Sequence, residues 1–200
     1  MPRDTFENLN PNKKKAIFDA AVREFSTRRF SEASINKIVK DAGISRGSFY
    51  QYFENKEDLY LHVLAEIGKE KMKVAFAEPP PEDADFFAAY MYLVKTILTW
   101  AREQPVYCKI GMLMDKDDSQ FIEKLKARVP EAWGELRSLI DRDKERGLIK
   151  PDVDGDLVIR MLMALNMYIL QDFYQTGSEE NLLRQVEDMI KIIRGGIANV

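Results

Sequence analysis

Hydrogen-bonding side chains of several kinds gather in eight residues near the start of the chain. Hydroxyl, amide and guanidinium groups form directional hydrogen bonds, which suit phosphates and base edges in the major groove of a duplex. Gly47 lies among them and has no side chain, so the main chain could approach a partner closely there. The candidate contact residues, all expected to be exposed on one short helix, are Ser45, Arg46, Ser48, Tyr50, Gln51 and Tyr52.

A preceding short helix must position these residues, and the apolar spacing predicts how it does so. Gly43 falls between the two helices, where a steep crossing over a tight turn needs a residue that adopts positive φ. Ser34 and Ser45 are suited to cap the two helices by accepting a hydrogen bond from a main-chain N–H. The residues expected to lock the two helices together are Ile38, Val39, Ala42, Ile44 and Phe49. This spacing predicts a helix-turn-helix, although a three-helix unit of another function would show similar spacing.

The charge of this region supports a nucleic-acid partner. From Lys13 to Lys56 there are ten Lys and Arg against five Asp and Glu, a local +5, which leaves 20 against 28, or -8, for the rest of a chain whose net charge is -3. A basic helix is expected from about Asn12 to Thr27. Lys56 begins a long linking helix that could reach Ala77, and a helix N-terminus is a place where a phosphate could dock.

Helical periodicity continues through the remainder, so the fold class is predicted to be all-α with about nine helices in total. Residues 1–55 are expected to form the helix-turn-helix DNA-binding domain. Residues 56–200 are expected to form a helical dimerisation and ligand-binding domain, with the linking helix over about 56–77 and a break at the three prolines 79–81. The further helices are expected at about 83–103, 105–114, 121–129, 130–146, 154–174 and 179–195.

Composition excludes several classes of site. Cys108 and His62 are the only cysteine and the only histidine, so neither an internal disulfide nor a Cys/His zinc set can form within one chain. A metal and a cofactor are therefore not expected. No Gly-rich phosphate loop and no Glu-x-x-His pair is present, which leaves a helical-bundle enzyme as a remote alternative. The apolar segment 157–170 is too short to span a bilayer, which takes about 20 residues, and a cytoplasmic protein is expected.

At the residues of the predicted helix-turn-helix the chain resembles the TetR family of bacterial transcriptional regulators, over roughly Lys15 to Leu64. The matching string is Ala33-Ser-Ile-Asn-Lys-Ile-Val-Lys-Asp-Ala-Gly-Ile-Ser-Arg-Gly-Ser-Phe-Tyr-Gln-Tyr-Phe-Glu-Asn-Lys-Glu-Asp-Leu59. The resemblance implies a regulator that binds double-stranded operator DNA. It also implies that the positions which typically contact the operator are Ser34, Ser45, Arg46, Ser48, Tyr50, Gln51, Tyr52 and Lys56. Ser34 stands where threonine is commoner, and Phe49 where leucine or isoleucine is usual.

The resemblance further implies that the last two helices form a four-helix bundle across a homodimer. The residue pattern agrees, because the helix at 157–174 is apolar on nearly every side and one face needs a cover. Burial in the core of one chain is the alternative. The residues expected at the dimer interface are Leu157, Met161, Leu165, Tyr168, Leu183, Val186, Ile190, Ile193 and Ile197.

An aromatic and methionine-rich set in the second domain suggests a pocket for a small apolar or amphipathic effector, although ordinary core is the alternative for each residue. The set is Tyr90, Met91, Trp100, Tyr107, Met112, Met114, Trp133, Met163, Asn166, Met167 and Tyr168. Asn166, expected in apolar surroundings, must bond either a neighbour or a ligand. The sequence thus predicts a ligand-released repressor, and the alternative is a DNA-binding regulator whose helical domain docks a protein partner.

Overall fold

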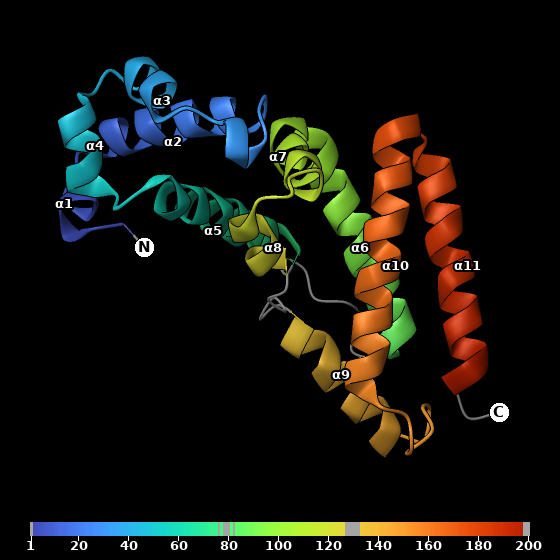
Figure 1. Cartoon of the computed structure of the whole chain (residues 1–200). Coiled ribbons are helices and arrows are strands. Elements are labelled where there is room, and N and C mark those ends of the chain that lie inside the picture. Colours follow the sequence, from blue (N-terminus) through green and yellow to red (C-terminus); the bar gives the residue numbers. More distant parts are fainter. Residues whose placement is uncertain (1, 76, 78–80, 82, 127–132, 198–200) are drawn as a thin grey trace. The chain divides into compact units, whose positions relative to one another are not determined.

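The computed structural model describes residues 2–75, 77, 81, 83–126 and 133–197, and in these it contains eleven α-helices, one 3₁₀ turn and no β-strand (Figure 1). The all-α prediction is therefore confirmed. The expected number of about nine helices is confirmed as well, and only the four-residue helix Asp4–Glu7 is covered by no expected helix.

The first half of the chain forms six of these elements before the proline-rich stretch. They are α1 (Asp4–Glu7), α2 (Pro11–Phe25), η1 (Phe30–Glu32), α3 (Ile35–Asp41), α4 (Arg46–Tyr52) and α5 (Lys56–Ala75). The second half forms α6 (Phe86–Glu103), α7 (Pro105–Asp115), α8 (Gln120–Lys126), α9 (Trp133–Glu145), α10 (Gly155–Thr176) and α11 (Glu179–Ile197). The expected start of one helix at Pro130 lies outside the described residues.

Side-chain caps define where the helices of the predicted helix-turn-helix begin. Ser34 Oγ accepts a hydrogen bond from Lys37 N at 3.4 Å, and Ser45 Oγ accepts one from Ser48 N at 3.0 Å. Gly43 has φ of +66°, a conformation that costs little only for glycine. Both caps and the glycine turn are as the sequence predicts.

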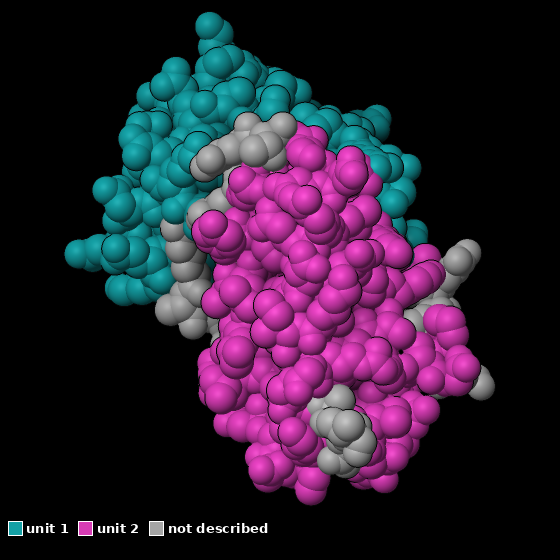
Figure 2. Space-filling model, turned by 90° about the vertical axis from the view of Figure 1, so that its right-hand side faces the viewer, with its two compact units in different colours: residues 1–74, 99–128 teal, residues 75–98, 129–200 magenta. Residues whose placement is uncertain are grey.

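Contacts between Cα atoms divide the chain into two compact units (Figure 2). Unit 1 comprises residues 1–74 and 99–128, and unit 2 comprises residues 75–98 and 129–200. The division by contacts differs from the functional division at residue 55, which remains a prediction. Unit 1 includes α7 and α8, two helices that the sequence assigns to the second domain.

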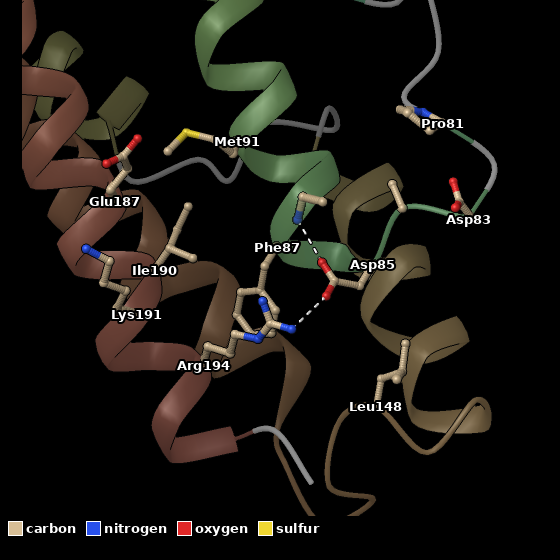
Figure 3. A pocket seen from close by; sticks show the side chains of 12 residues that line it. Pro81, Asp83, Asp85, Phe87, Met91, Leu148, Glu187, Ile190, Lys191 and Arg194 are labelled. Atoms are coloured by element: carbon tan, nitrogen blue, oxygen red, sulfur yellow. Dashed lines mark hydrogen bonds and ion pairs between the residues drawn. The ribbon is translucent and has the colours of Figure 1, made fainter. Parts of the chain in front are cut away.

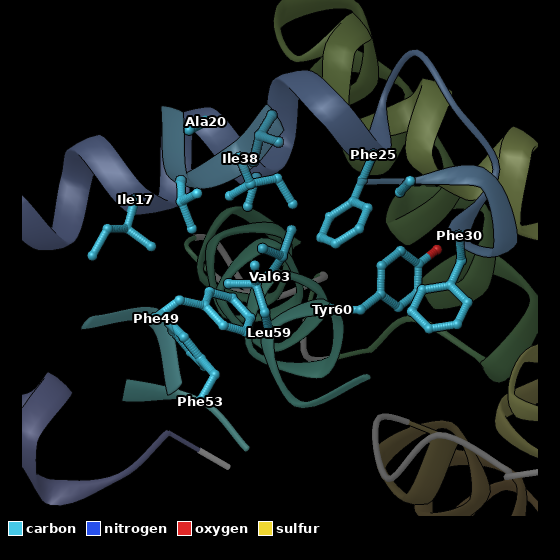
Figure 4. Packing of buried hydrophobic residues seen from close by; sticks show 14 of the residues in the cluster. Ile17, Ala20, Phe25, Phe30, Ile38, Phe49, Phe53, Leu59, Tyr60 and Val63 are labelled. Atoms are coloured by element: carbon cyan, nitrogen blue, oxygen red, sulfur yellow. The ribbon is translucent and has the colours of Figure 1, made fainter. Parts of the chain in front are cut away.

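The core of unit 1 is rich in aromatic side chains. In Figure 4 Phe49 and Phe53 lie to the left of Leu59 and Val63, and Phe25, Tyr60 and Phe30 continue the cluster to the right. Ile110 of α7 and Ile122 of α8 are buried in this same cluster. The helix-turn-helix therefore shares one core with helices from beyond the proline-rich stretch.

Unit 2 is built on α10 and α11, which lie side by side and are joined through Gly177 (Figure 1). Gly177 has φ of +68° and ends α10. Asp143 of α9 is fully buried, and its carboxylate accepts a hydrogen bond from Phe86 N at 2.6 Å, which ties α9 to the first turn of α6.

Candidate nucleic-acid interface

The outer face of α4 carries the predicted contact residues. Arg46 is exposed, and its guanidinium donates to Asn36 Oδ1 of α3 at 3.1 Å and lies 5.9 Å from the centre of the Tyr50 ring. Tyr50 has 40% of its surface exposed, although large aromatic side chains are usually covered. Gln51 and Gly47 are exposed as well. We call the exposed residues Ser45, Arg46, Gly47, Tyr50 and Gln51 the α4 surface.

The three serines of the predicted set have a structural role. Ser45 Oγ and Ser48 Oγ lie 2.9 Å apart at the first turn of α4, and Ser48 is half-buried. Ser34 is also half-buried, and its main-chain N–H donates to Glu24 Oε1 at 2.8 Å. Their hydroxyl groups keep free lone pairs at the helix start, because one accepted bond does not saturate an oxygen.

The expectation that Tyr52 is exposed is wrong. Only 7% of its surface is accessible, because its ring packs edge-on against Phe6 of α1, with a centroid distance of 6.3 Å. The sequence predicted no helix before residue 12, so nothing in the pattern supplied this cover.

The same N-terminal residues also bond to the end of α4. Arg3 donates to Tyr50 O at 2.9 Å through its guanidinium and to Tyr52 O at 2.9 Å through its main-chain N–H, and Thr5 Oγ1 donates to Gln51 O. The last carbonyls of a helix lack partners within the helix, and a cation is favoured beside them. Sequence reasoning missed these residues, since the contacts join positions 46 and more apart in the chain.

Lys56 is less exposed than the sequence predicts, and its role as a phosphate contact stays a prediction. Its side chain is half-buried, and Nζ donates to Ser31 O at 3.2 Å and to Ala33 O at 2.9 Å. The ammonium also lies 4.7 Å from the centre of the Phe30 ring. Burial lowers the pKa of Lys56. Reaching a phosphate would require the side chain to leave these two carbonyls.

An exposed apolar stripe runs along α10, as predicted for a dimer interface. Its members recur at helical spacing and have 40% to 68% of their surface accessible, and they are Leu157, Met161, Leu165 and Tyr168. Isolated exposed apolar residues are common, but a contiguous row of four large ones on one helix face indicates a surface that a partner covers.

On α11 the predicted interface residues are partly wrong. Val186 and Ile193 are buried in the core of unit 2, with 1% and 7% of their surface accessible, and Leu183, Ile190 and Ile197 are partly buried against that core. Ile192 of the same helix is 77% exposed. The apolar period of the helix is correct, but most of that face is covered by the chain itself.

In unit 2 the predicted effector residues whose side chains are described differ in burial. Asn166 donates from Nδ2 to the hydroxyl of the buried Tyr90, so it bonds a neighbour. Burial raises the pKa of Tyr90 to about 12, although the bond from Asn166 acts in the opposite direction. Tyr168 is 68% exposed and belongs to the stripe on α10. The side chains of Trp133, Met163 and Met167 lie outside the described part of the chain.

Four other members of the predicted set lie in unit 1, namely Trp100, Tyr107, Met112 and Met114. Trp100 is buried and donates from Nε1 to Glu70 at 3.3 Å, and its ring stacks on Tyr107 at 6.0 Å. Met112 and Met114 are partly buried, and Met114 packs against the core of unit 1. The set is therefore divided between the two units, and a common pocket remains a prediction.

Unit 2 has an open groove of about 690 Å³ between α6 and α11 (Figure 3). Phe87, Met91 and Ile190 line it, and at one side Asp85 pairs with Arg194 at 3.3 Å. Among the predicted effector residues whose side chains are described, only Met91 lines this groove. A hollow of about 630 Å³ in unit 1 is lined by none of these described residues, but by residues of α1, α2 and α5 that include His62 and Lys14.

The described residues show neither a metal-binding cluster nor a membrane-spanning helix. They contain no group of three or more His, Cys, Asp or Glu side chains placed to hold a metal ion. None of the helices in this part of the chain is long and apolar enough to cross a membrane.

Comparison with known proteins gives consistent matches. Residues 17–63 match the family described as "Bacterial regulatory proteins, tetR family". The fatty acid metabolism regulator protein of Bacillus subtilis is 39% identical over 188 residues, which are 92% of this chain and 94% of that protein. Among solved structures, the fatty acid degradation regulator FadR from Bacillus halodurans has a TM-score of 0.73 at 20% identity, with 94% of this chain and 97% of that chain covered. FadR from Bacillus subtilis in complex with stearoyl-CoA has a TM-score of 0.71 at 18% identity, with coverages of 92% and 99%.

Proposed function

The chain belongs to the TetR family of bacterial regulatory proteins and is a DNA-binding transcriptional regulator, and from this premise we propose how it acts. We propose that it is a homodimeric repressor that an apolar or amphipathic small molecule releases from its operator. Because its relatives are transcriptional regulators, a helical-bundle enzyme is excluded.

The observation that carries the proposal is the α4 surface. Arg46, Tyr50 and Gln51 present a guanidinium, a phenol and an amide from one short helix, and Arg46 is oriented by its bond to Asn36. Such groups read base edges and phosphates in a major groove. Gly47 supports a close approach of the main chain, since even an added Cβ would meet only Ser45 Oγ at 3.7 Å. Ser34 and Ser48 supply further hydroxyl groups at the helix starts.

A homodimer supplies the second reading helix. Two recognition helices reach successive major grooves when their centres are about 34 Å apart, so one operator needs two copies of α4. The stripe on α10, together with Ile192 of α11, supports a dimer joined through these two helices.

The effector is proposed to be a long-chain acyl compound. The Bacillus subtilis FadR structure contains stearoyl-CoA, and the relative at 39% identity is a fatty acid metabolism regulator. An acyl chain matches the apolar and amphipathic class that the methionine-rich and aromatic residues predict. The α5 helix, which begins beside the helix-turn-helix, would transmit binding to α4.

Titration of stearoyl-CoA, stearate and free CoA against a labelled duplex tests the effector. The duplex is the one most enriched from a random-sequence library by the wild-type protein. Fluorescence anisotropy should show a 5- to 150-fold loss of affinity, corresponding to about 1 to 3 kcal/mol of coupling, with stearoyl-CoA and none with CoA. DNA must weaken binding of the acyl compound by the same factor, measured through the buried Trp100. Absence of any change with all three compounds would contradict this effector class.

The second candidate is that the helical domain docks a protein partner. The groove in Figure 3 favours it, because it is open and its floor is formed by apolar side chains. Met91→Glu and Ile190→Glu would block the groove. Titration of stearoyl-CoA against the wild type and both variants, each bound to the labelled duplex, distinguishes release by a small molecule from docking of a protein. Release of the wild-type protein by stearoyl-CoA would count against this candidate, and release that persists in both variants would show that the acyl compound does not act through this groove.

A further inference from the structure

The turn that leads into α3 is held at its main chain by three charged side chains from outside it. Asp117 Oδ2 accepts a hydrogen bond from Ser31 N at 2.7 Å, and Glu24 Oε1 accepts one from Ser34 N at 2.8 Å. Lys56 Nζ donates to Ser31 O and Ala33 O. We call residues 31–34 the α3 entry turn. The donor and the acceptor of Ser31 are thus bound by side chains of opposite charge.

Asp117 reaches this turn from the segment between α7 and α8, 86 positions later in the chain. Only 2% of its surface is accessible, and its other oxygen accepts from Ser119 N at 2.9 Å. Burial alone would raise its pKa, but the hydrogen bonds from Ser119 and Ser31 outweigh that effect and lower the pKa of Asp117 to about 2. The carboxylate is therefore charged at neutral pH and fixed through both oxygens.

Aromatic packing holds the same two segments together. Phe30, directly before the α3 entry turn, lies 4.6 Å from the Phe121 ring of α8 and 5.0 Å from the Tyr60 ring of α5. Phe30 is buried and Ile122 of α8 is fully buried in the shared core. A displacement of α8 would therefore displace the turn.

The entry turn ends where α3 begins, and α3 positions the α4 surface. Ser34 caps α3, and Asn36 in its first turn bonds Arg46 of α4. Because the turn is short and bonded on both sides, a shift of Ser31 passes to the residues that face DNA.

We propose that Asp117 is a positioning residue for DNA reading, which fixes α3 and α4 from the α7–α8 segment through the main chain of Ser31. Lys56 is its counterpart from α5, and it acts by holding the turn rather than by contacting a phosphate. The inference rests on the proposed role of the α4 surface in reading DNA.

The test compares Asp117→Asn with Asp118→Asn, an exposed neighbour that loses the same charge. Affinity is measured for the most enriched duplex from a random library and for a scrambled duplex of the same composition. Asp117→Asn should weaken binding to the enriched duplex by about 5- to 10-fold, within the range of coupling mutations, and should leave the scrambled duplex unchanged. Exchange of the Ser31 amide proton should become faster in Asp117→Asn alone, and Asp117→Glu, which keeps the charge, should restore part of the affinity.

Lys56→Met gives an independent measurement, because it keeps the side-chain stem over Phe30 but removes the donor. A phosphate contact would weaken both duplexes and reduce the slope of log affinity against log salt by about 1. A positioning role weakens only the enriched duplex and leaves the slope unchanged. The double variant should lose less affinity than the two single losses combined, since both act on one turn.

The variants test the role of the α4 surface and the role of Asp117 separately. If Tyr50→Ala leaves the affinity for the enriched duplex unchanged, the role of the α4 surface fails. If Tyr50→Ala weakens binding but Asp117→Asn matches Asp118→Asn, the role of Asp117 is overturned. Should Asp117→Asn not fold, Lys56→Met decides by the same criteria.

Discussion

The helices around α4 bury most of their large apolar side chains, whereas the α10–α11 pair leaves a row of them exposed. In unit 1 the aromatic residues Phe25, Phe49 and Phe53 are enclosed together with Ile110 and Ile122, while the α4 surface presents polar groups, which include the phenol of the exposed Tyr50. On α10, four large apolar residues remain 40% to 68% exposed after the core of unit 2 has formed.

This difference indicates which kind of partner each region binds. A surface whose apolar residues are already buried gains affinity from hydrogen bonds and charge, as DNA recognition requires. An exposed apolar row gains free energy when a second apolar surface covers it, about 25 cal/mol for each Å² buried. This difference supports our proposal that the molecule reads a polar partner with the first region and pairs with its own copy through the second.

The largest effect is expected from charges placed on the α10 stripe. Met161→Glu together with Leu165→Glu puts two carboxylates into the proposed interface, where unpaired buried charges cost more than a truncation. The dimer dissociation constant should rise by at least about 100-fold, which corresponds to about 2.7 kcal/mol, and sedimentation should show folded monomers.

Ser138→Glu is the control for this experiment, because it adds a carboxylate on an exposed position of α9. A double variant that stays dimeric, or a wild type that is monomeric at micromolar concentration, would remove the contrast between the two regions. Val186→Glu should instead unfold unit 2, since Val186 is buried within the chain.

The next effect concerns the α4 surface alone. Arg46→Ala and Tyr50→Ala should each weaken binding to the enriched duplex by about 1 to 3 kcal/mol and leave the dimer intact. Lys124→Ala, which removes one positive charge from an exposed position on α8, is the matched control. Equal affinities for all three variants, measured by fluorescence anisotropy, would show that α4 does not read DNA.

Substitution of two glycines tests the stability of this region and its DNA binding separately. Gly43→Ala should lower the free energy of unfolding by about 1 to 2 kcal/mol, because alanine is strained at φ of +66° although nothing lies within 4 Å of the added Cβ. Gly47→Ala should not lower the stability, because Gly47 lies within α4 and has room for a Cβ, and it should weaken only DNA binding. Urea unfolding and anisotropy on both variants check this, and a destabilised Gly47→Ala would contradict the role of Gly47 in close approach.

The smallest expected effect is a pH dependence of stability, which tests whether the aromatic core of unit 1 excludes water from His62. Burial lowers the pKa of His62, which lies 5.0 Å from the Phe6 ring, although Glu66 and Glu7 act in the opposite direction. The unfolded chain then binds the proton more readily, so the free energy of unfolding should fall as the pH drops below about 6.5. His62→Gln should flatten this dependence between about pH 7 and pH 5.5 in urea unfolding. Parallel curves for the variant and the wild type would mean that His62 is solvated.

Local chemistry was predictable from the sequence. Ser34, Ser45 and Gly43 act within a few residues of themselves, so residue type and spacing determine their caps and the turn. The exposed row on α10 was also predictable, because that helix has more apolar residues than one face can use.

Contacts between distant positions were not predictable. Periodicity identified the apolar face of α11 but could not tell that the chain itself covers Val186, while Ile192 stays exposed. Tyr52 and Lys56 were misjudged for the same reason, since α1 covers the one and the α3 entry turn binds the other. Asp117 gave no signal, because a loop aspartate is usually solvated.

The DNA sequence that the wild-type protein selects from a random library tests the central claim most directly. A homodimer that places two copies of α4 in successive major grooves should enrich an inverted repeat whose half-site centres lie about 10 base pairs, or a multiple of that, apart. The monomeric Met161→Glu and Leu165→Glu variant should lose the preference for the repeat. Enrichment of no sequence, or of a sequence without two-fold symmetry, would contradict the account.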